Sequence, residues 1–245
     1  MAEWFEEAFR ADYLRVYPHR DDASATGEVG AWMGRLPGLA RGRRVLDLAC
    51  GAGRHLRAMR AAGILAAGCD LSEDLLAAAA ARESHCLVRC DMRALPFRAA
   101  TFDAVTCFFS SFGYFAGEAD DAAGLLEASR ILSPRGGLLL DLMDAETVRR
   151  DLVRRSEREA GGLRLVEERF LSADGMRVEK SVTLVEGGRE RRWKESVRLY
   201  APGEVEGMAS AAGFTPAGRF GGHGPEPWRS GVTPRCVLLF RKAAA

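Results

Sequence analysis

Residues 45–56 read Val45-Leu46-Asp47-Leu48-Ala49-Cys50-Gly51-Ala52-Gly53-Arg54-His55-Leu56. This is the pattern of a short apolar strand carrying an acid, followed by a glycine-rich turn and the start of a helix. The glycines at 51 and 53 permit positive φ angles and let a ligand approach the backbone closely. Because the amides at a helix start are free, they favour an anionic or hydrogen-bonding ligand group. The stretch predicts a ligand site at a strand-to-helix turn.

The same alternation of apolar runs and helical segments continues on the C-terminal side of this turn. The strand-like runs are 45–48, 64–69, 85–89, 102–108 and 138–142, and the helical segments are 54–62, 73–83 and 118–132. Strands that are apolar throughout are buried on both faces, and helices between them imply a parallel, doubly wound sheet. On the N-terminal side, residues 3–16 and 23–36 have the apolar spacing of helices.

The pattern changes after about residue 160. Three segments alternate apolar and polar residues and are joined by turn-forming sequences: Leu163–Leu171, Met176–Val185 and Arg191–Leu199. They predict a three-stranded antiparallel β meander. A free meander edge would invite pairing with a second copy of the chain, which leaves a homodimer open. A helix at 202–212 and a strand at 235–241 complete the predicted fold.

The composition narrows the class of protein. The 245 residues are 47% hydrophobic and 28% charged, which is typical of a globular chain. The formal charge of +1 lacks the basic surplus of an obligate nucleic-acid binder, so nucleic acid is not the expected partner. Residues 1–9 do not resemble a signal peptide and no long apolar run predicts a membrane span, so we expect a cytoplasmic protein. The six cysteines lack metal-site spacing, and no metal is expected.

Acids at the ends of successive strands indicate the ligand. A dinucleotide fingerprint would need a glycine at Leu56, so a pyrophosphate turn of that kind is excluded. Asp70, at the end of the second strand, can accept from both hydroxyls of a ribose. After the third strand, Asp91 can accept from an adenine amine and the Met92 amide can donate to a ring nitrogen. Together with Asp47, these acids predict a cationic nucleoside, and S-adenosylmethionine (SAM), a sulfonium with an ammonium group, fits that description.

These residues resemble the class I SAM-dependent methyltransferases, whose hallmark is D-x-x-C-G-x-G after the first strand. The resemblance covers about 40–145 and 197–241, and includes Leu132–Gly137 and Ala211–Phe214. It implies a mostly parallel, seven-stranded Rossmann-like sheet with the inserted antiparallel meander, and SAM as cofactor. The cofactor-binding residues that it implies are Asp47, Ala49, Cys50, Gly51, Gly53, Asp70, Leu71, Asp91, Met92, Phe108 and Arg20.

The loop after the fourth strand, Cys107–Phe115, is rich in aromatic residues and is expected to face the transferring methyl group. It is similar to the corresponding loop of the amino-sugar N,N-dimethyltransferases. That resemblance implies that Arg20 pairs with the SAM carboxylate and that Tyr17 closes over the sulfonium. It implies that Tyr114 lies near the acceptor nitrogen, and Tyr17 and Tyr114 are the candidate catalytic residues. The chain departs from those enzymes at Asp141–Asp144, where they carry a tryptophan-rich segment.

From these features we expect three parts: a helical lid at 1–38, a SAM-binding core at 39–145 plus 197–245, and the meander at 146–196 as a substrate or dimer element. The expected function is transfer of a methyl group from SAM to a nitrogen or oxygen of a small-molecule acceptor. Two alternatives stay open, a tRNA or protein methyltransferase and a SAM-binding protein without catalytic activity.

Overall fold

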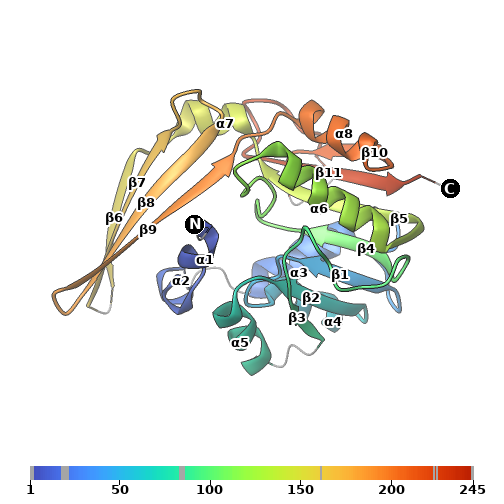
Figure 1. Ribbon diagram of the computed structural model, residues 1–245, viewed down its shortest axis with the longest axis horizontal. Helices are drawn as coiled ribbons and strands as arrows, with labels where there is room; N and C mark the ends of the chain where they lie inside the picture. Colours follow the sequence, from blue (N-terminus) through green and yellow to red (C-terminus); the bar gives the residue numbers. More distant parts are fainter. Residues whose placement is uncertain are drawn as a thin grey trace.

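The structure of the protein is a computed structural model, which describes residues 3–17, 22–82, 86–160, 162–222, 224 and 226–243 (Figure 1). Its larger sheet has seven strands in the order β10-β11-β5-β4-β1-β2-β3. The strands are β1 (Arg44–Leu48), β2 (Leu65–Asp70), β3 (Leu87–Arg89), β4 (Phe102–Cys107), β5 (Leu132–Met143), β10 (Phe214–Phe220) and β11 (Arg235–Lys242). β11 lies between β5 and β10 and runs antiparallel to both, whereas the other strand pairs among the described residues of this sheet are parallel. The predicted mostly parallel, seven-stranded sheet is confirmed.

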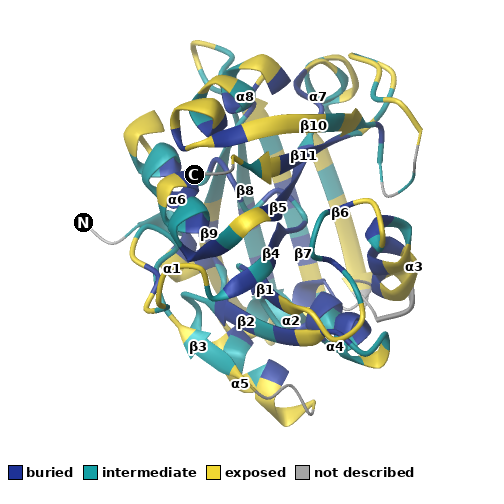
Figure 2. Cartoon of the chain, turned by 90° about the vertical axis from the view of Figure 1, so that its right-hand side faces the viewer, coloured by how far each residue is buried: buried dark blue, intermediate teal, exposed yellow. Residues whose placement is uncertain are grey.

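Helices cover both faces of this sheet. The helices are α3 (Asp22–Trp32), α4 (Arg54–Ala61), α5 (Glu73–Ala81), α6 (Glu118–Ile131) and α8 (Pro202–Ala211). One apolar core joins α3 and α4 to the sheet, and a separate one joins α6 and α8 to the opposite face. Figure 2 shows the buried residues concentrated along the central strands. These strands are therefore apolar for the predicted reason, because both of their faces are buried.

A second sheet is built from the segment between β5 and α8. After α7 (Ala145–Asp151) it contains β6 (Arg155–Ala160), β7 (Leu163–Leu171), β8 (Arg177–Glu186) and β9 (Arg189–Arg198), all antiparallel and in chain order. The prediction of three strands is wrong, because β6 pairs with β7 along its length. Its sequence, Arg-Ser-Glu-Arg-Glu-Ala, has no apolar alternation, and its described side chains are mostly exposed. An edge strand of this composition gives no periodic signal.

The N-terminal segment lies between the second sheet and the main body (Figure 1). The expected helix 3–16 is two helices, α1 (Trp4–Ala8) and α2 (Ala11–Val16), because the backbone of Phe9 and Arg10 leaves the helical region. The expected helix 23–36 ends at Trp32. A third apolar core seals the N-terminal segment to the inner face of the second sheet, and its buried members are Ala8, Val16, Tyr17, Leu165, Val182, Leu184 and Trp193. No helix in the described ranges is both long and apolar enough to cross a membrane.

Candidate active site

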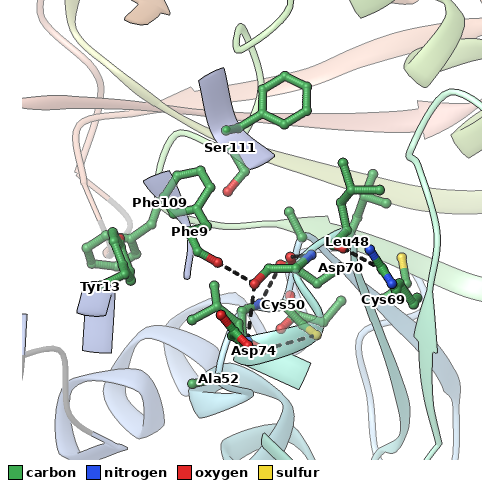
Figure 3. A pocket seen from close by; sticks show the side chains of 18 of the residues that line it. Phe9, Tyr13, Leu48, Cys50, Ala52, Cys69, Asp70, Asp74, Phe109 and Ser111 are labelled. Carbon is green, nitrogen blue, oxygen red and sulfur yellow. Dashed lines mark hydrogen bonds between the residues drawn. The ribbon is translucent and has the colours of Figure 1, made fainter. Parts of the chain in front are cut away.

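The turn after β1 is held by the acid at the end of β2 (Figure 3). Gly51 and Gly53 have φ angles of 54° and 75°, as expected of glycines at this turn, and Gly53 caps α4. The carboxylate of Asp70 accepts from the amide of Gly51 at 2.8 Å and from the amide of Ser72 at 2.9 Å. One carboxylate therefore fixes the turns that follow both β1 and β2. Burial raises the pKa of Asp70, which these amide bonds partly offset.

Asp47 is the acid of β1 and is 1% exposed. Its Oδ1 accepts from the Thr106 hydroxyl at 3.1 Å, whereas its Oδ2 has no hydrogen-bond partner among the described residues. Burial raises the pKa of this carboxyl to about 7. Buried polar atoms are nearly always paired in native proteins, so an open carboxylate oxygen at a cavity wall fits a cationic group of a bound molecule.

Asp91 follows β3, but it is not an isolated acid. The guanidinium of Arg93 donates to its Oδ2 at 2.6 Å and also reaches Asp120 at 3.1 Å. Burial alone would raise the pKa of Asp91, but the hydrogen bonds from Arg93 outweigh burial and leave that pKa below its usual value. Asp91 is therefore neutralised by Arg93, and Asp47 and Asp70 are the strand-end carboxyls without an ion-pair partner among the described residues. The charge of Arg93, two residues from Asp91, is a local signal that sequence reasoning missed.

One cavity of about 560 Å³ lies outside the carboxyl ends of β1, β2, β3 and β4. The predicted site residues that line it are Tyr17, Asp47, Ala49, Cys50, Gly51, Asp70, Leu71, Asp91, Met92, Phe108 and Tyr114. Gly53 is not among the lining residues and is the N-cap residue of α4. Arg20 lies outside the described residues. No cluster of three potential metal ligands occurs in the part of the chain that the structure describes.

Aromatic rings from the N-terminal segment and from the loop after β4 form another part of the cavity wall. The ring of Tyr114 lies 4.9 Å from that of Trp4 and 5.6 Å from that of Phe9, measured between centroids. The indole of Trp4 also donates to the Tyr114 carbonyl at 3.1 Å. The N-terminal helices and the loop after β4 therefore close this side of the cavity together.

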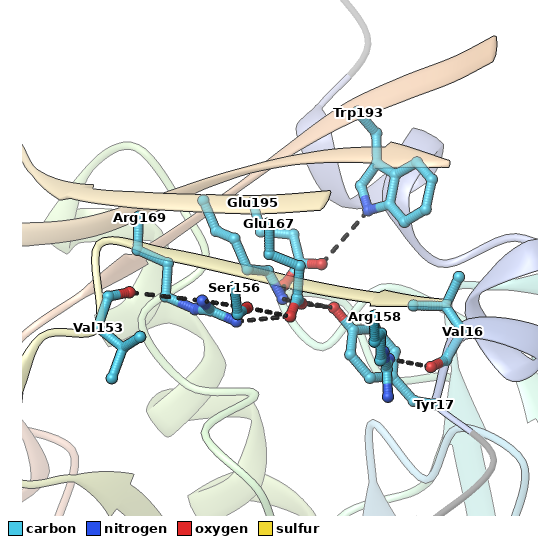
Figure 4. Close-up of polar contacts among 10 residues, drawn as sticks. Val16, Tyr17, Val153, Ser156, Arg158, Glu167, Arg169, Trp193 and Glu195 are labelled. Carbon is cyan, nitrogen blue, oxygen red and sulfur yellow. Dashed lines mark hydrogen bonds and ion pairs between the residues drawn. The ribbon is translucent and has the colours of Figure 1, made fainter. Parts of the chain in front are cut away.

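Tyr17 lines the same cavity, but its hydroxyl points to the second sheet (Figure 4). The hydroxyl donates to Glu167 at 2.6 Å and accepts from Lys180 at 2.8 Å. Burial, with Glu195 and Glu167 nearby, raises the pKa of Tyr17, so the phenol stays protonated. Arg158 of β6 donates to the Val16 carbonyl beside it. The second sheet thus holds the N-terminal segment by polar contacts as well as by the third apolar core.

The loop after β4 has two residues near its start in the left-handed region, Phe109 at φ 58° and Ser110 at φ 60°. The fully buried Asp141 accepts from the Phe109 amide at 2.9 Å. Arg235 of β11 donates to Asp141 at 2.5 Å and to the Ser110 hydroxyl at 3.0 Å. Backbone of this kind costs about 1–3 kcal/mol per residue and persists only where the surroundings impose it. Here the buried ion pair imposes it.

Sequence reasoning also missed a buried pair beside the cavity. The Nε2 of His55 lies 2.5 Å from the Glu28 carboxylate, and the His55 ring stacks on Phe108 with centroids 4.1 Å apart. Burial lowers the pKa of His55 despite Glu28. The two residues are far apart in the sequence and share no motif, so no pattern in the chain could have found the pair.

Comparisons with known proteins agree with this geometry. A family model described as a methyltransferase domain matches residues 45–136. A dTDP-3-amino-3,6-dideoxy-alpha-D-glucopyranose N,N-dimethyltransferase of Streptomyces fradiae is 31% identical in an alignment of 188 residues, and the match covers 72% of this chain and 73% of that protein. A demethylmenaquinone methyltransferase of Corynebacterium kroppenstedtii is 40% identical over 99 residues, 40% of each chain.

Solved structures share the fold. The CcbJ methyltransferase of Streptomyces caelestis superposes with a TM-score of 0.76 at 20% identity, over 89% of this chain and 90% of that one. A sugar N-methyltransferase of a Streptoalloteichus species superposes with a TM-score of 0.71 at 23% identity, over 95% of this chain and 92% of that one.

Proposed function

Because this chain belongs to the class I SAM-dependent methyltransferases, we propose that it transfers the methyl group of SAM to the amine of a small molecule. SAM is the methyl donor, and the acceptor is a small molecule. The observation that carries the choice of acceptor group is that the acidic strand ends and the hydroxyl-bearing aromatic wall open onto one cavity. The acids hold the cationic donor, whereas the aromatic wall excludes water and favours the uncharged amine, whose lone pair attacks the methyl group as the bond from methyl to sulfur breaks.

The residues at the strand ends suit SAM. The open Oδ2 of Asp47 matches the ammonium or sulfonium charge, and Asp70 at the next strand end matches the ribose hydroxyls. Asp91 and the Met92 amide are proposed to hold the adenine, with Leu71 and Phe108 packed against the nucleoside. The backbone at Ala49, Cys50 and Gly51 is proposed to follow the amino-acid part. SAM supplies an electrophilic methyl group whose sulfonium charge disperses as the methyl leaves.

The chain's own task is mainly alignment, which can contribute about 7–11 kcal/mol to lowering the barrier. Tyr114 is proposed to orient the acceptor, with Ser111 as a second hydroxyl on the same wall. Tyr17 is proposed to close the methyl-donor end as part of a lid at 1–38. In the same proposal the core is 39–145 plus 197–245, and 146–196 is the element on which the lid rests. Pairing of that element into a homodimer remains a proposal.

An amino sugar is the acceptor class that the Streptomyces fradiae relative supports. The chain departs from that subfamily at Asp141 and Asp144, and the structure gives both acids structural partners. Asp141 pairs with Arg235, and Asp144 accepts from the Trp228 indole at 2.9 Å. Neither acid lines the cavity, but Asp141 holds the loop after β4, so we propose that this loop accounts for an acceptor ring that differs from that relative's substrate.

Incubating the purified protein with labelled SAM and a panel of acceptors tests the proposed function. The panel contains an amino-sugar nucleotide, a simple primary amine, a phenol, a carboxylic acid and unmodified tRNA. We expect label on an amine, and we expect Tyr114→Phe to lower turnover about tenfold with unchanged SAM affinity, as for one lost hydrogen bond. Label on tRNA alone would favour a nucleic-acid methyltransferase. Tight SAM binding with no acceptor labelled would favour a non-catalytic binding protein.

SAM affinity is expected to depend on pH through Asp47. Below a pKa of about 7 its carboxyl is protonated and must lose a proton before it can pair with a cation. Affinity is therefore lost as the pH falls, by about tenfold between pH 8 and pH 6. Titration calorimetry at several pH values measures this change.

Asp47→Asn is the control for this pH dependence, because it keeps the shape of the side chain without the titrating proton. The variant should bind SAM more weakly at pH 8 and lose the component of the pH profile that Asp47 contributes. Identical profiles for the two proteins would exclude Asp47 as the titrating group.

A further inference from the structure

Arg177, the first residue of β8, reaches from the second sheet to the loop after β4. Its guanidinium donates to the carbonyls of Phe115 at 3.0 Å, Tyr114 at 3.2 Å and Gly113 at 3.3 Å. It also donates to the hydroxyl of Ser196 at 2.8 Å and to its carbonyl at 3.0 Å. The side chain is half-buried, and no carboxylate within the described residues forms an ion pair with it.

Three consecutive carbonyls of one loop are thus bound by one side chain. The same segment has further anchors at Gly113, whose amide donates to the buried Asp121 at 3.1 Å and whose carbonyl accepts from the Arg198 amide at 2.8 Å. Gly113 has a φ of 94°, and a Cβ there would lie 3.2 Å from the Arg198 carbonyl. The loop is pressed against the end of β9 at the point where Arg177 holds it.

The chemistry of this contact favours arginine. Partly burying a guanidinium is costly unless its donors are paired, and only a planar fork of five N–H groups can serve several carbonyls on one side. A lysine ammonium could not span the three loop carbonyls and Ser196. This side chain therefore couples the conformation of the loop to the position of the second sheet.

We propose that Arg177 is a positioning residue for methyl transfer. By fixing the carbonyls on both sides of Tyr114, it sets where the ring of Tyr114 stands at the acceptor end of the cavity. The second sheet then shapes the acceptor site through the loop, in addition to carrying the N-terminal segment. This inference rests on the proposed function, in which the loop after β4 faces the acceptor.

Arg177→Ala and Arg177→Lys test the proposal against Arg149→Ala as a matched control. Arg149 is likewise a half-buried arginine that donates twice to a carbonyl, that of Gly175; it also pairs with Glu146, and none of these hydrogen bonds goes to the loop. Hydrogen exchange measured by mass spectrometry follows peptides spanning 108–116 and 45–56. Calorimetry gives the SAM dissociation constant, and steady-state kinetics with the labelled amine give kcat and KM.

For Arg177→Ala we expect exchange in 108–116 to rise about tenfold with 45–56 unchanged, and SAM affinity to stay within about twofold. The kcat/KM for the acceptor should fall about 30-fold, since small misplacements of reacting groups have effects of that order. Arg177→Lys should recover little, and millimolar guanidinium should partly restore Arg177→Ala. Arg149→Ala should match the wild type.

Unchanged exchange in 108–116, or an equal loss of acceptor kinetics in Arg149→Ala, would overturn the positioning role. A parallel loss of SAM affinity in Arg177→Ala would also overturn it, because that result indicates a general structural effect. If the loop loosens as expected while the wild-type protein methylates no amine, the positioning contact stands and the proposed function fails.

Discussion

Asp70→Ala is expected to weaken SAM binding by about 100-fold while the chain stays folded. The amides of Gly51 and Ser72 position the carboxylate, so the carboxylate is already oriented when the ribose binds. Two charge-assisted hydrogen bonds to a diol contribute about 1.5–3 kcal/mol each, of which solvation of the free site recovers part. A net loss near 3 kcal/mol corresponds to the expected factor. Because the variant also releases the turn after β1, the effect on the free energy of unfolding must be measured beside the affinity.

Calorimetry and thermal unfolding separate the two effects. Asp70→Asn keeps an oxygen for one of the backbone amides but removes the charge, so we expect an intermediate loss of about tenfold. Glu168→Ala, which removes an exposed acid of the second sheet that does not line the cavity, should change the SAM affinity by less than about twofold. Equal affinities for Asp70→Ala and the wild type would show that the ligand does not use the end of β2.

Asp141→Ala is expected to cause the largest loss of stability. It leaves the guanidinium of Arg235, which is 17% exposed, without its carboxylate, and it removes the acceptor for the Phe109 amide. Breaking a buried ion pair on one side costs about 3–5 kcal/mol. For a chain of this length that corresponds to a drop in Tm on the order of 10 °C. Chemical denaturation gives the free energy of unfolding directly.

Two further variants make this result specific. Glu168→Ala breaks an exposed pair with Arg155 and should cost less than about 1 kcal/mol. Asp141→Leu combined with Arg235→Met removes both charges and should recover part of the stability, since no buried charge is left alone. Recovery should be incomplete, because Phe109 and Ser110 still lack their anchor. A loss from Asp141→Ala no greater than that from Glu168→Ala would mean that the buried pair contributes little.

The sequence predicted the parts of the site that short patterns encode. The carboxyl ends of parallel strands share one edge, so acids at the ends of β1, β2 and β3 had to lie near one another. The cavity lined by Asp47, Asp70 and Asp91 follows from that rule. The glycine-rich turn was predictable for the same reason, because its residues are contiguous and only glycine adopts such φ angles freely.

The contacts that join distant segments could not be predicted. Asp141 meets Arg235 across 94 residues, and Arg177 meets Gly113 across 64. In the sequence each of these residues is an ordinary charged side chain, and no neighbouring residue indicates its partner. β6 was not predicted for a different reason: an exposed edge strand needs no apolar face, so its sequence lacks the alternation that indicates a strand. Sequence patterns report burial and backbone geometry, whereas these pairs depend on how the elements assemble.

The interior position of β11 constrains how the protein can be made. The ribosome synthesises the chain from its N-terminus, so β5 and β10 both emerge before β11. In the folded protein, however, β11 is inserted between these two strands. Until residues 235–242 are available, the nascent chain carries β5 with an open, strongly apolar edge. Such edges are templates for aggregation, and unfinished domains are prone to it. We therefore expect polypeptides that stop short of β11 to require chaperones to stay in solution.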